Sequence, residues 1–243
     1  LHAGGEDLIF PHHENEIAQS TCGTGKLFAR HWMHVKHLLI DNETMSKSKG
    51  NFLTIPDLLE KGHSPQAIRY LLAGSHYRKP LNFGFEGLSG AKAALERLHG
   101  LVVRLDEVSG EGPEGKAAEA CVEARRTFDA SLADDLNTPE ALAAVHGLVG
   151  RANALLADGA LTRGGAARVR AELASMDVVF GVLLPGGGAE DRLSPEEQGL
   201  FDERQEARRR REFARADSAR ARLEALGVVL EDTPKGTRWR RKG

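Results

Sequence analysis

A chain of 243 residues, 41% hydrophobic and 28% charged, has an ordinary globular composition, and its length suits one large domain or two to three small ones. No apolar run approaches the ~18–20 residues of a membrane span, so we expect no membrane-spanning helix. Two widely separated cysteines, Cys22 and Cys121, exclude a disulfide scaffold and suit a reducing, cytoplasmic compartment.

The net charge of −2 is unevenly distributed along the chain. Residues 202–243 carry 13 Lys and Arg against 8 Asp and Glu, a net charge of +5, so the remainder carries −7. A basic C-terminal segment on an acidic body indicates a surface that faces a polyanion. A solvated, salt-bridged helix explains the same charge equally well, and charge alone leaves both interpretations open.

The first predicted elements lie in residues 1–63, a stretch rich in histidine, glycine and short polar motifs. Apolar runs at 8–10 and 37–40 are typical of strands. Pro11 suits the first position of a helix, where its missing N–H is harmless, and this helix is expected to end near Thr21. We therefore expect a small α/β part at the start of the chain.

Helical periodicity replaces this pattern from Ser64 onward. Ser64 and Pro65 resemble an N-cap and a first helical residue, and apolar side chains then recur every three or four positions. The expected helices cover residues 88–105, 117–132, 139–157 and 165–183. Helices this regular, joined by short polar breaks, favour a bundle over residues 64–185.

A third part follows a glycine-rich linker and covers residues 190–243. Ser194 and Glu197 have the capping-box spacing that opens a helix. The predicted elements are a helical stretch to about 226, a strand at 228–230 and a return strand at 237–239. These elements predict a small helix-plus-β-hairpin unit at the end of the chain.

The most informative hexapeptide is Pro11-His12-His13-Glu14-Asn15-Glu16. His12 and Glu16 are four residues apart, so on a helix they share one face and can hold one Zn²⁺ between them. Zinc usually takes four ligands, and neither cysteine of the chain has the spacing of a partner. Taken alone, the pattern is more often an ordinary surface His–Glu pair.

Two further motifs carry weaker signals of nucleotide chemistry. Glycines in residues 4–7 allow a ligand to approach the backbone, and Asp7 can accept hydrogen bonds from ribose hydroxyls. Lys47, on a small-residue loop with Ser46 and Ser48, can place its charge against phosphate oxygens. Each motif is also compatible with a plain turn or surface loop.

Taken together, these motifs resemble the cysteinyl-tRNA synthetases. Residues 2–16, HAGGEDLIFPHHENE, are similar to the zinc-side signature of that family. Residues 44–48, TMSKS, resemble the KMSKS signature of class I aminoacyl-tRNA synthetases. Residues 75–78 (SHYR) and 134–139 (DDLNTP) resemble the family's helical domain, and residues 227–240 resemble its anticodon-reading unit, so the resemblance covers essentially the whole chain.

The resemblance implies that the chain is the C-terminal half of a class I enzyme and begins, at Leu1, inside the catalytic domain. The implied activity is ATP-dependent attachment of cysteine to tRNA(Cys) through cysteinyl-adenylate, with Mg²⁺ accompanying the ATP. His12 and Glu16 match two zinc ligands of the family, and its two cysteine ligands are expected before Leu1. The implied zinc selects the cysteine thiolate. Lacking half of this site, the chain is expected to be inactive alone.

The resemblance also implies roles for residues toward ATP and tRNA. Lys47 matches the loop lysine that contacts ATP phosphates in the transition state of adenylation, with Ser46 and Ser48 beside it and Asp7 facing the ribose. The KMSKS-type motif is Thr44, Met45, Ser46, Lys47 and Ser48, in which Thr44 replaces the family's first lysine and puts full catalytic strength in question. The implied anticodon-loop contacts are Arg208, Asp217, Arg220, Asp232 and Trp239. Trp239 is equally compatible with stacking on a base and with a small-domain core.

We predict a mainly α fold with a small α/β part. The remnant of a Rossmann-type catalytic domain is expected in residues 1–63, a tRNA-contacting helical bundle in 64–185 and an anticodon-binding unit in 190–243. The predicted activity is that of a cysteine--tRNA ligase. Two alternatives are a mycothiol-pathway cysteine ligase, which joins cysteine to an amino sugar and is disfavoured by residues 227–241, and a non-catalytic tRNA-binding module.

Overall fold

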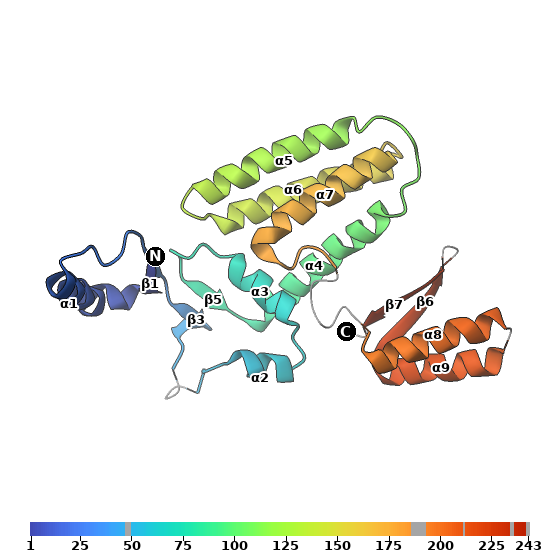
Figure 1. Ribbon diagram of the computed structural model, residues 1–243, viewed down its shortest axis with the longest axis horizontal. Helices are drawn as coiled ribbons and strands as arrows, with labels where there is room; N and C mark the ends of the chain where they lie inside the picture. The colour runs from blue at the N-terminus through green and yellow to red at the C-terminus, as the bar shows by residue number, and fades with distance from the viewer. Residues whose placement is uncertain (47–49, 186–192, 211, 234–235, 242–243) are drawn as a thin grey trace. The chain divides into compact units, whose positions relative to one another are not determined.

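The computed structural model describes residues 1–46, 50–185, 193–210, 212–233 and 236–241. The chain forms two compact units, Leu1–Leu184 and Pro185–Gly243. Both are built mainly from helices with a few short strands, as the sequence predicts (Figure 1). Among the described residues no helix is long and apolar enough to cross a membrane.

The first unit begins with a two-stranded parallel sheet, β1 (His2–Gly5) and β2 (Trp32–Val35). Two short helical turns, Glu6–Leu8 and Ile9–His13, connect β1 to α1 (Glu14–Thr24). The strand expected at 8–10 is therefore wrong, because those residues lie in the turns. The helix expected from Pro11 to Thr21 begins, as an α-helix, at Glu14 and ends three residues later than expected.

A second small sheet follows in the order β4-β3-β5, with β3 antiparallel to β4 and parallel to β5. Its strands are β3 (Leu38–Ile40), β4 (Glu43–Thr44) and β5 (Leu81–Phe83), and the helices α2 (Ile55–Glu60) and α3 (Pro65–Ala73) lie between β4 and β5 in the chain. The strand expected at 37–40 is confirmed as β3. Ile40, Leu58, Ile68, Phe83 and Leu88 form the small core beneath this sheet.

Four long helices make the bundle: α4 (Phe85–Leu105), α5 (Lys116–Ala133), α6 (Thr138–Ala157) and α7 (Arg163–Phe180). They match the expected helices to within a few residues. The α5, α6 and α7 helices pack against one another beside α4 (Figure 1). Caps start two of them, since the side chains of Asn137 and Thr162 accept hydrogen bonds from the backbone amides of Glu140 and Gly165.

The second unit contains α8 (Pro195–Arg209), α9 (Phe213–Ala225) and the antiparallel hairpin of β6 (Val228–Thr233) and β7 (Gly236–Arg241). The capping box of Ser194 and Glu197 is formed as predicted. The single helical stretch expected to 226 is two helices, broken between Arg209 and Phe213. This break lets α9 fold back on α8 and close a small core of Leu200, Leu223, Val228 and Leu230.

Candidate functional site

The parallel pair of β1 and β2 presents aromatic and imidazole rings on one face. Alternate residues of a strand share a face, so His2 and Gly4 lie on the same side as their register partners Trp32 and His34. The His2 and Trp32 ring centroids are 4.9 Å apart. A Cβ on Gly4 would lie 2.9 Å from Cε1 of His13. The glycine therefore leaves the space that His13 fills.

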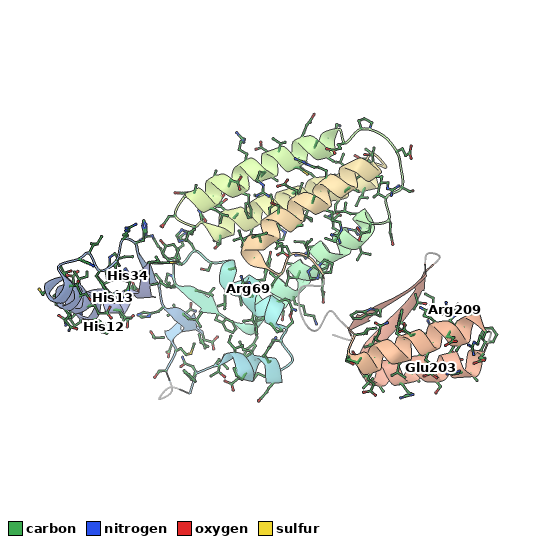
Figure 2. All side chains as sticks on the ribbon, in the orientation of Figure 1. His12, His13, His34, Arg69, Glu203 and Arg209 are labelled. Atoms are coloured by element: carbon green, nitrogen blue, oxygen red, sulfur yellow. The ribbon has the colours of Figure 1, made fainter. Side chains whose placement is uncertain are left out.

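His13 is the centre of this cluster and is only 3% exposed. Its Nδ1 lies 2.8 Å from Nε2 of His34 in a hydrogen bond (Figure 2 labels both rings). Burial lowers the pKa of His13, and the neighbouring His2 and His34 lower it further. The ring is thus held neutral at neutral pH, in the form that accepts a hydrogen bond or a metal ion.

Glu16 brings a carboxylate to the same place from the first turns of α1. Its Oε1 lies 3.6 Å from Nε2 of His12 and its Oε2 lies 2.9 Å from Nε2 of His2. Oε2 is nevertheless buried and makes no hydrogen bond with the described residues, although the His2 nitrogen lies close to it. A buried carboxylate oxygen with an unused lone pair is costly unless a further ligand binds it.

The group of ligand atoms within mutual reach shares only Glu16 with the predicted pair of His12 and Glu16. Ligand atoms of His2, His13 and Glu16 all lie within 4.8 Å of one another. Sequence reasoning gave no role to His2, and the short strand β1 that carries it was not predicted. His12 is the exposed member of the cluster.

The residues fit a metal ion held between His12 and Glu16. Ligands about 2.0–2.1 Å from a tetrahedral zinc lie about 3.3 Å from each other. The 3.6 Å between His12 Nε2 and Glu16 Oε1 is close to that separation. Imidazole nitrogen and carboxylate oxygen are both zinc donors, whereas Cys22 and Cys121 are not members of the described cluster.

The structure describes part of the two motifs that were assigned to nucleotide binding, the glycines with Asp7 and the segment 44–48. Asp7 is exposed. A Cβ atom on Gly5 would lie only 2.3 Å from Oδ1 of Asp7. Thr44 ends β4, Met45 packs against the small core, and the Ser46 amide donates to Oδ1 of Asn51 at 2.8 Å. The predicted positions Lys47 and Ser48 lie outside the described residues.

In the second unit, two of the predicted RNA contacts bind each other. Asp232 accepts from Arg208 through Oδ1 at 2.6 Å and from Arg204 through Oδ2 at 2.7 Å. Arg204 is 4% exposed and also donates to the Thr237 hydroxyl at 3.1 Å, and that hydroxyl donates to Asp232. Hydrogen bonds from Arg204 and then Thr237 lower the pKa of Asp232 to about 2. Asp232 therefore fastens the hairpin to α8.

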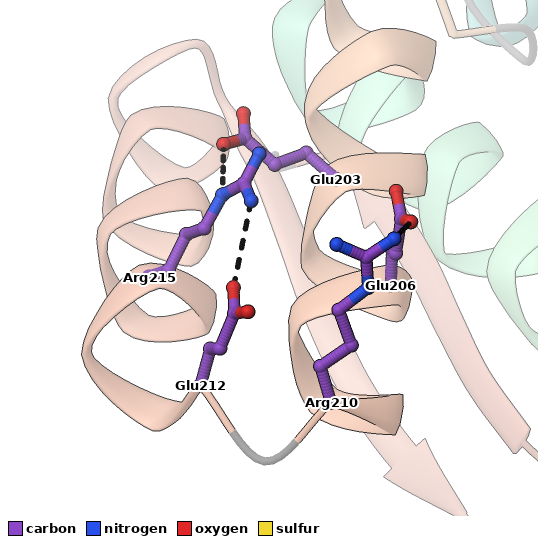
Figure 3. A network of polar contacts seen from close by, with 5 residues as sticks. All are labelled: Glu203, Glu206, Arg210, Glu212 and Arg215. Atoms are coloured by element: carbon purple, nitrogen blue, oxygen red, sulfur yellow. Dashed lines mark hydrogen bonds and ion pairs between the residues drawn. The ribbon is translucent and has the colours of Figure 1, made fainter.

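Two further arginines of this unit are tied to carboxylates, one of them from α9 to α8. Figure 3 shows Arg215 between Glu203 and Glu212, at 2.8 and 3.4 Å, and Arg210 paired with Glu206. By contrast, three exposed arginines have no carboxylate partner within the described part of the unit: Arg209, Arg220 and Arg222. Among the described side chains of this unit, unpaired positive charge therefore comes from these three residues and not from Arg208, which is paired with Asp232.

One exposed stripe of α9 combines three kinds of side chain. Phe213, Asp217 and Arg220 are spaced by four and three residues, which places them on one face of the helix, beside the face that buries Ala216, Ala219 and Leu223. Phe213 is 65% exposed, whereas Trp239 is half-buried and packs against the small core. Asp217 and Arg220, two of the predicted anticodon-loop contacts, both lie on this stripe. Sequence reasoning missed Phe213, whose signal was its helical spacing from them.

Family models match three stretches of the chain. A model described as the tRNA synthetases class I (C) catalytic domain matches residues 1–93. The DALR domain matches residues 127–184, and the cysteinyl-tRNA ligase anticodon binding domain matches residues 190–240. The first match contains His2, His12, His13, Glu16 and His34, called the histidine-rich cluster below. The last match contains the exposed stripe of α9.

Relatives align over the whole chain. It is 45% identical over 243 residues to a cysteine--tRNA ligase of Solibacter usitatus, covering 100% of this chain and 52% of the relative. Over 250 residues, 100% of this chain, it is 41% identical to the cysteine--tRNA ligase of Escherichia coli O6:K15:H31, of which it covers 52%. The chain thus spans about half the length of these relatives.

A solved structure supports the fold. The chain resembles a LeuRS-tRNA-LeuAMS ternary complex from Agrobacterium radiobacter K84 agnB2 with a TM-score of 0.59 and 19% identity, over 74% of this chain and 26% of that one. At this identity the likeness concerns the arrangement of helices and strands alone.

Proposed function

Since the chain belongs to the cysteinyl-tRNA synthetase family, we propose that it supplies the metal-holding, ATP-phosphate and tRNA-recognising parts of an enzyme that attaches cysteine to tRNA(Cys) through cysteinyl-adenylate. In this proposal residues 1–63 belong to the catalytic domain. Residues 64–185 form a tRNA-contacting bundle, and residues 190–243 read the anticodon. The compartment is the cytoplasm, where tRNA, cysteine and ATP meet.

The observation that carries the proposal is the buried, unbonded Oε2 of Glu16 beside His2, with His12 facing the other carboxylate oxygen. His12 and Glu16 would hold the zinc, and His13 and His34 would keep the surrounding rings in place. When bound, zinc supplies a direct thiolate ligand site that serine and alanine cannot fill. Selection of cysteine then rests on donor chemistry, so shape alone need not distinguish it from serine.

ATP binding is assigned to the motifs on either side of this cluster. Asp7, which is exposed, would accept from the ribose hydroxyls. Lys47, with Ser46 and Ser48, would contact the phosphates, and its charge would act most strongly as charge develops during adenylation. Thr44 supplies no positive charge at the head of this loop, so Lys47 carries the electrostatic role of the KMSKS-type motif.

For tRNA recognition we assign the exposed stripe of α9 to the anticodon loop. Phe213 would stack on an unpaired base, Asp217 would accept from a base edge, and Arg220 would meet a phosphate. Arg208 and Asp232 would shape the surface through their mutual ion pair, and Trp239 would act through the core on which it packs. The anticodon-binding match over residues 190–240 favours this function over a mycothiol-pathway cysteine ligase.

Measurement of zinc binding tests the assignment of His12 and Glu16 as ligands. The chain carries two of the assigned ligands, so we expect weak Zn²⁺ binding, measured by competition with a chromophoric chelator. Glu16→Gln and His12→Ala are expected to abolish it, and His37→Ala, which alters an exposed histidine outside the cluster, is the matched control. Tight stoichiometric zinc that survives Glu16→Gln would show that the ligands lie elsewhere.

A further inference from the structure

A groove of about 930 Å³ runs between α4 and α6 of the bundle. Its α4 wall includes Glu96, Arg97, Gly100 and Arg104, and its α6 wall includes Asn153 beside small and aliphatic side chains. The groove is distinct from the histidine-rich cluster and from the stripe of α9, and neither of those sites uses its residues.

The two arginines of the groove are spaced along one face of α4. Arg97, Gly100 and Arg104 are separated by three and four residues, so they point the same way, and Arg97 and Arg104 are about 10 Å apart along the helix axis. Nothing lies within 4 Å of the position that a Cβ on Gly100 would take. The floor between the two guanidinium groups is therefore open to a ligand.

Both guanidinium groups keep their positive charge available. Nη2 of Arg104 donates to Oδ1 of Asn153 at 2.7 Å, and this neutral acceptor orients the group without cancelling its charge. Arg97 has no carboxylate partner among the residues that the structure describes. Burial lowers the pKa of His146, and the positive charge of Arg97 lowers it further.

Three other arginines of the bundle are paired with carboxylates. Arg125 donates to Glu172 at 2.6 Å, Arg126 to Glu123 at 2.8 Å and Arg170 to Asp106 at 3.0 Å. Arg151, Arg163 and Arg168 are exposed and, among the described residues, also lack a carboxylate partner. The groove differs because it places two unpaired guanidinium groups on one face of a single helix, α4.

We propose that the groove between α4 and α6 binds the sugar–phosphate backbone of RNA, with Arg97 and Arg104 on separate phosphates of one strand. A small anion cannot reach two guanidinium groups about 10 Å apart, whereas a polyanionic strand can. Glu96, the acidic residue of the groove, opposes the strand by charge. The proposal rests on the tRNA function above and adds to it a contact remote in sequence from the anticodon-reading residues.

Titrations of the chain with fluorescent whole tRNA at two salt concentrations test this contact. We expect Arg97→Gln and Arg104→Gln each to weaken binding about three- to ten-fold at low salt and to lower the salt slope by about 1, the signature of one lost phosphate contact. Arg126→Gln removes the same charge from an exposed, paired arginine of the bundle and is expected to change affinity less than two-fold (~1.5-fold). Glu96→Gln is expected to strengthen binding.

A second ligand separates this proposal from the proposed function. The isolated anticodon stem-loop should bind wild type and the Arg97→Gln/Arg104→Gln variant equally, because the stem-loop is assigned to the second unit. Binding of whole tRNA with the same affinity and slope in that variant as in Arg126→Gln would overturn the groove and leave the anticodon assignment standing. Failure of the wild-type chain to bind either RNA would overturn both. Unchanged thermal melting of the variants, whose altered residues are exposed, ties any loss to the contact.

Discussion

The helical bundle and the first 39 residues are held together by different kinds of interaction. The bundle encloses a continuous apolar core in which side chains such as Leu101, Leu148 and Leu173 are almost completely buried. In residues 1–39, all of them described, the one buried residue is a histidine, His13. Large apolar side chains there, including Phe10 and Leu27, are exposed.

This difference separates stability from chemistry. Hydrophobic burial is proportional to area and tolerates many sequences, so the bundle can serve as a scaffold. A cluster of imidazoles and a carboxylate is stable only if its polar atoms find partners, so it depends on a few residues. We therefore expect substitutions in the bundle to alter the free energy of unfolding and substitutions in the cluster to alter ligand binding.

The largest effect on stability is expected from Leu148→Ala. Leu148 is fully enclosed on α6, and truncating such a leucine leaves a cavity that costs about 2–5 kcal/mol. Urea unfolding followed by circular dichroism measures the loss. Val178→Ala, at an 86% exposed position of α7, is the control and should change the free energy of unfolding by no more than about 0.5 kcal/mol. Equal effects of the two would mean that the bundle core is not the source of stability.

A smaller effect is expected at the end of α7. Asp177 accepts from the backbone amides of Val182, Leu183 and Leu184, at 2.8, 2.7 and 3.2 Å, and so fixes the turn that closes the bundle. Asp177→Ala leaves these amides without their acceptor and should cost about 2 kcal/mol in the same assay. Asp129→Ala removes an exposed ion pair with Arg125 and should cost about 0.5 kcal/mol or less. If Asp177→Ala costs no more stability than Asp129→Ala, the capping role of Asp177 is refuted.

The smallest effect on stability is expected from changing Asp135. This residue belongs to a set of hydrogen bonds, called the clasp below, that joins the two regions. Tyr77 and Arg78 donate to the carboxylate of Asp135 in the turn between α5 and α6, and the Lys36 amide, next to β2, donates to the Tyr77 carbonyl at 2.8 Å. Arg78 and then Tyr77 lower the pKa of Asp135 to about 2.

The lowered pKa sets the pH window of the clasp. An unfolded aspartate has a pKa of about 3.9, so the stabilisation is complete above about pH 4 and is lost as the pH falls toward 2. The difference in urea midpoint between wild type and Asp135→Asn should shrink across that window. A difference that stays constant from pH 6 to pH 2 would show that the carboxylate charge is not what the clasp uses.

Much of the bundle was predictable from the sequence because its periods of three and four are local. The 88–105 and 139–157 helices follow from spacing and from caps such as Asn137. The strands of the histidine-rich cluster were not predictable in this way. β1 is short and half glycine, and its partner β2 is about thirty residues away, so the pairing that brings His2 beside Trp32 is non-local.

The candidate site shows the same limit. His12 and Glu16 were predicted because they are neighbours on the chain. His2 lies on a different element, β1, and meets Glu16 of α1 only in the folded chain. In the second unit, Asp217 and Arg220 were named from the family resemblance, but only the packed core shows that Trp239 faces inward while Phe213 faces solvent.

Anticodon discrimination by the chain itself is the most direct test of the account. Labelled tRNA with the GCA anticodon and the same tRNA with an altered anticodon would be titrated against wild type, Asp217→Ala and Phe213→Ala. We predict that wild type prefers the GCA anticodon, that Asp217→Ala erodes the preference, and that Phe213→Ala weakens both complexes because a stacked base contributes about 1–3 kcal/mol. Equal affinity of wild type for the two tRNAs, unchanged in both variants, would contradict the assignment of the α9 stripe to the anticodon.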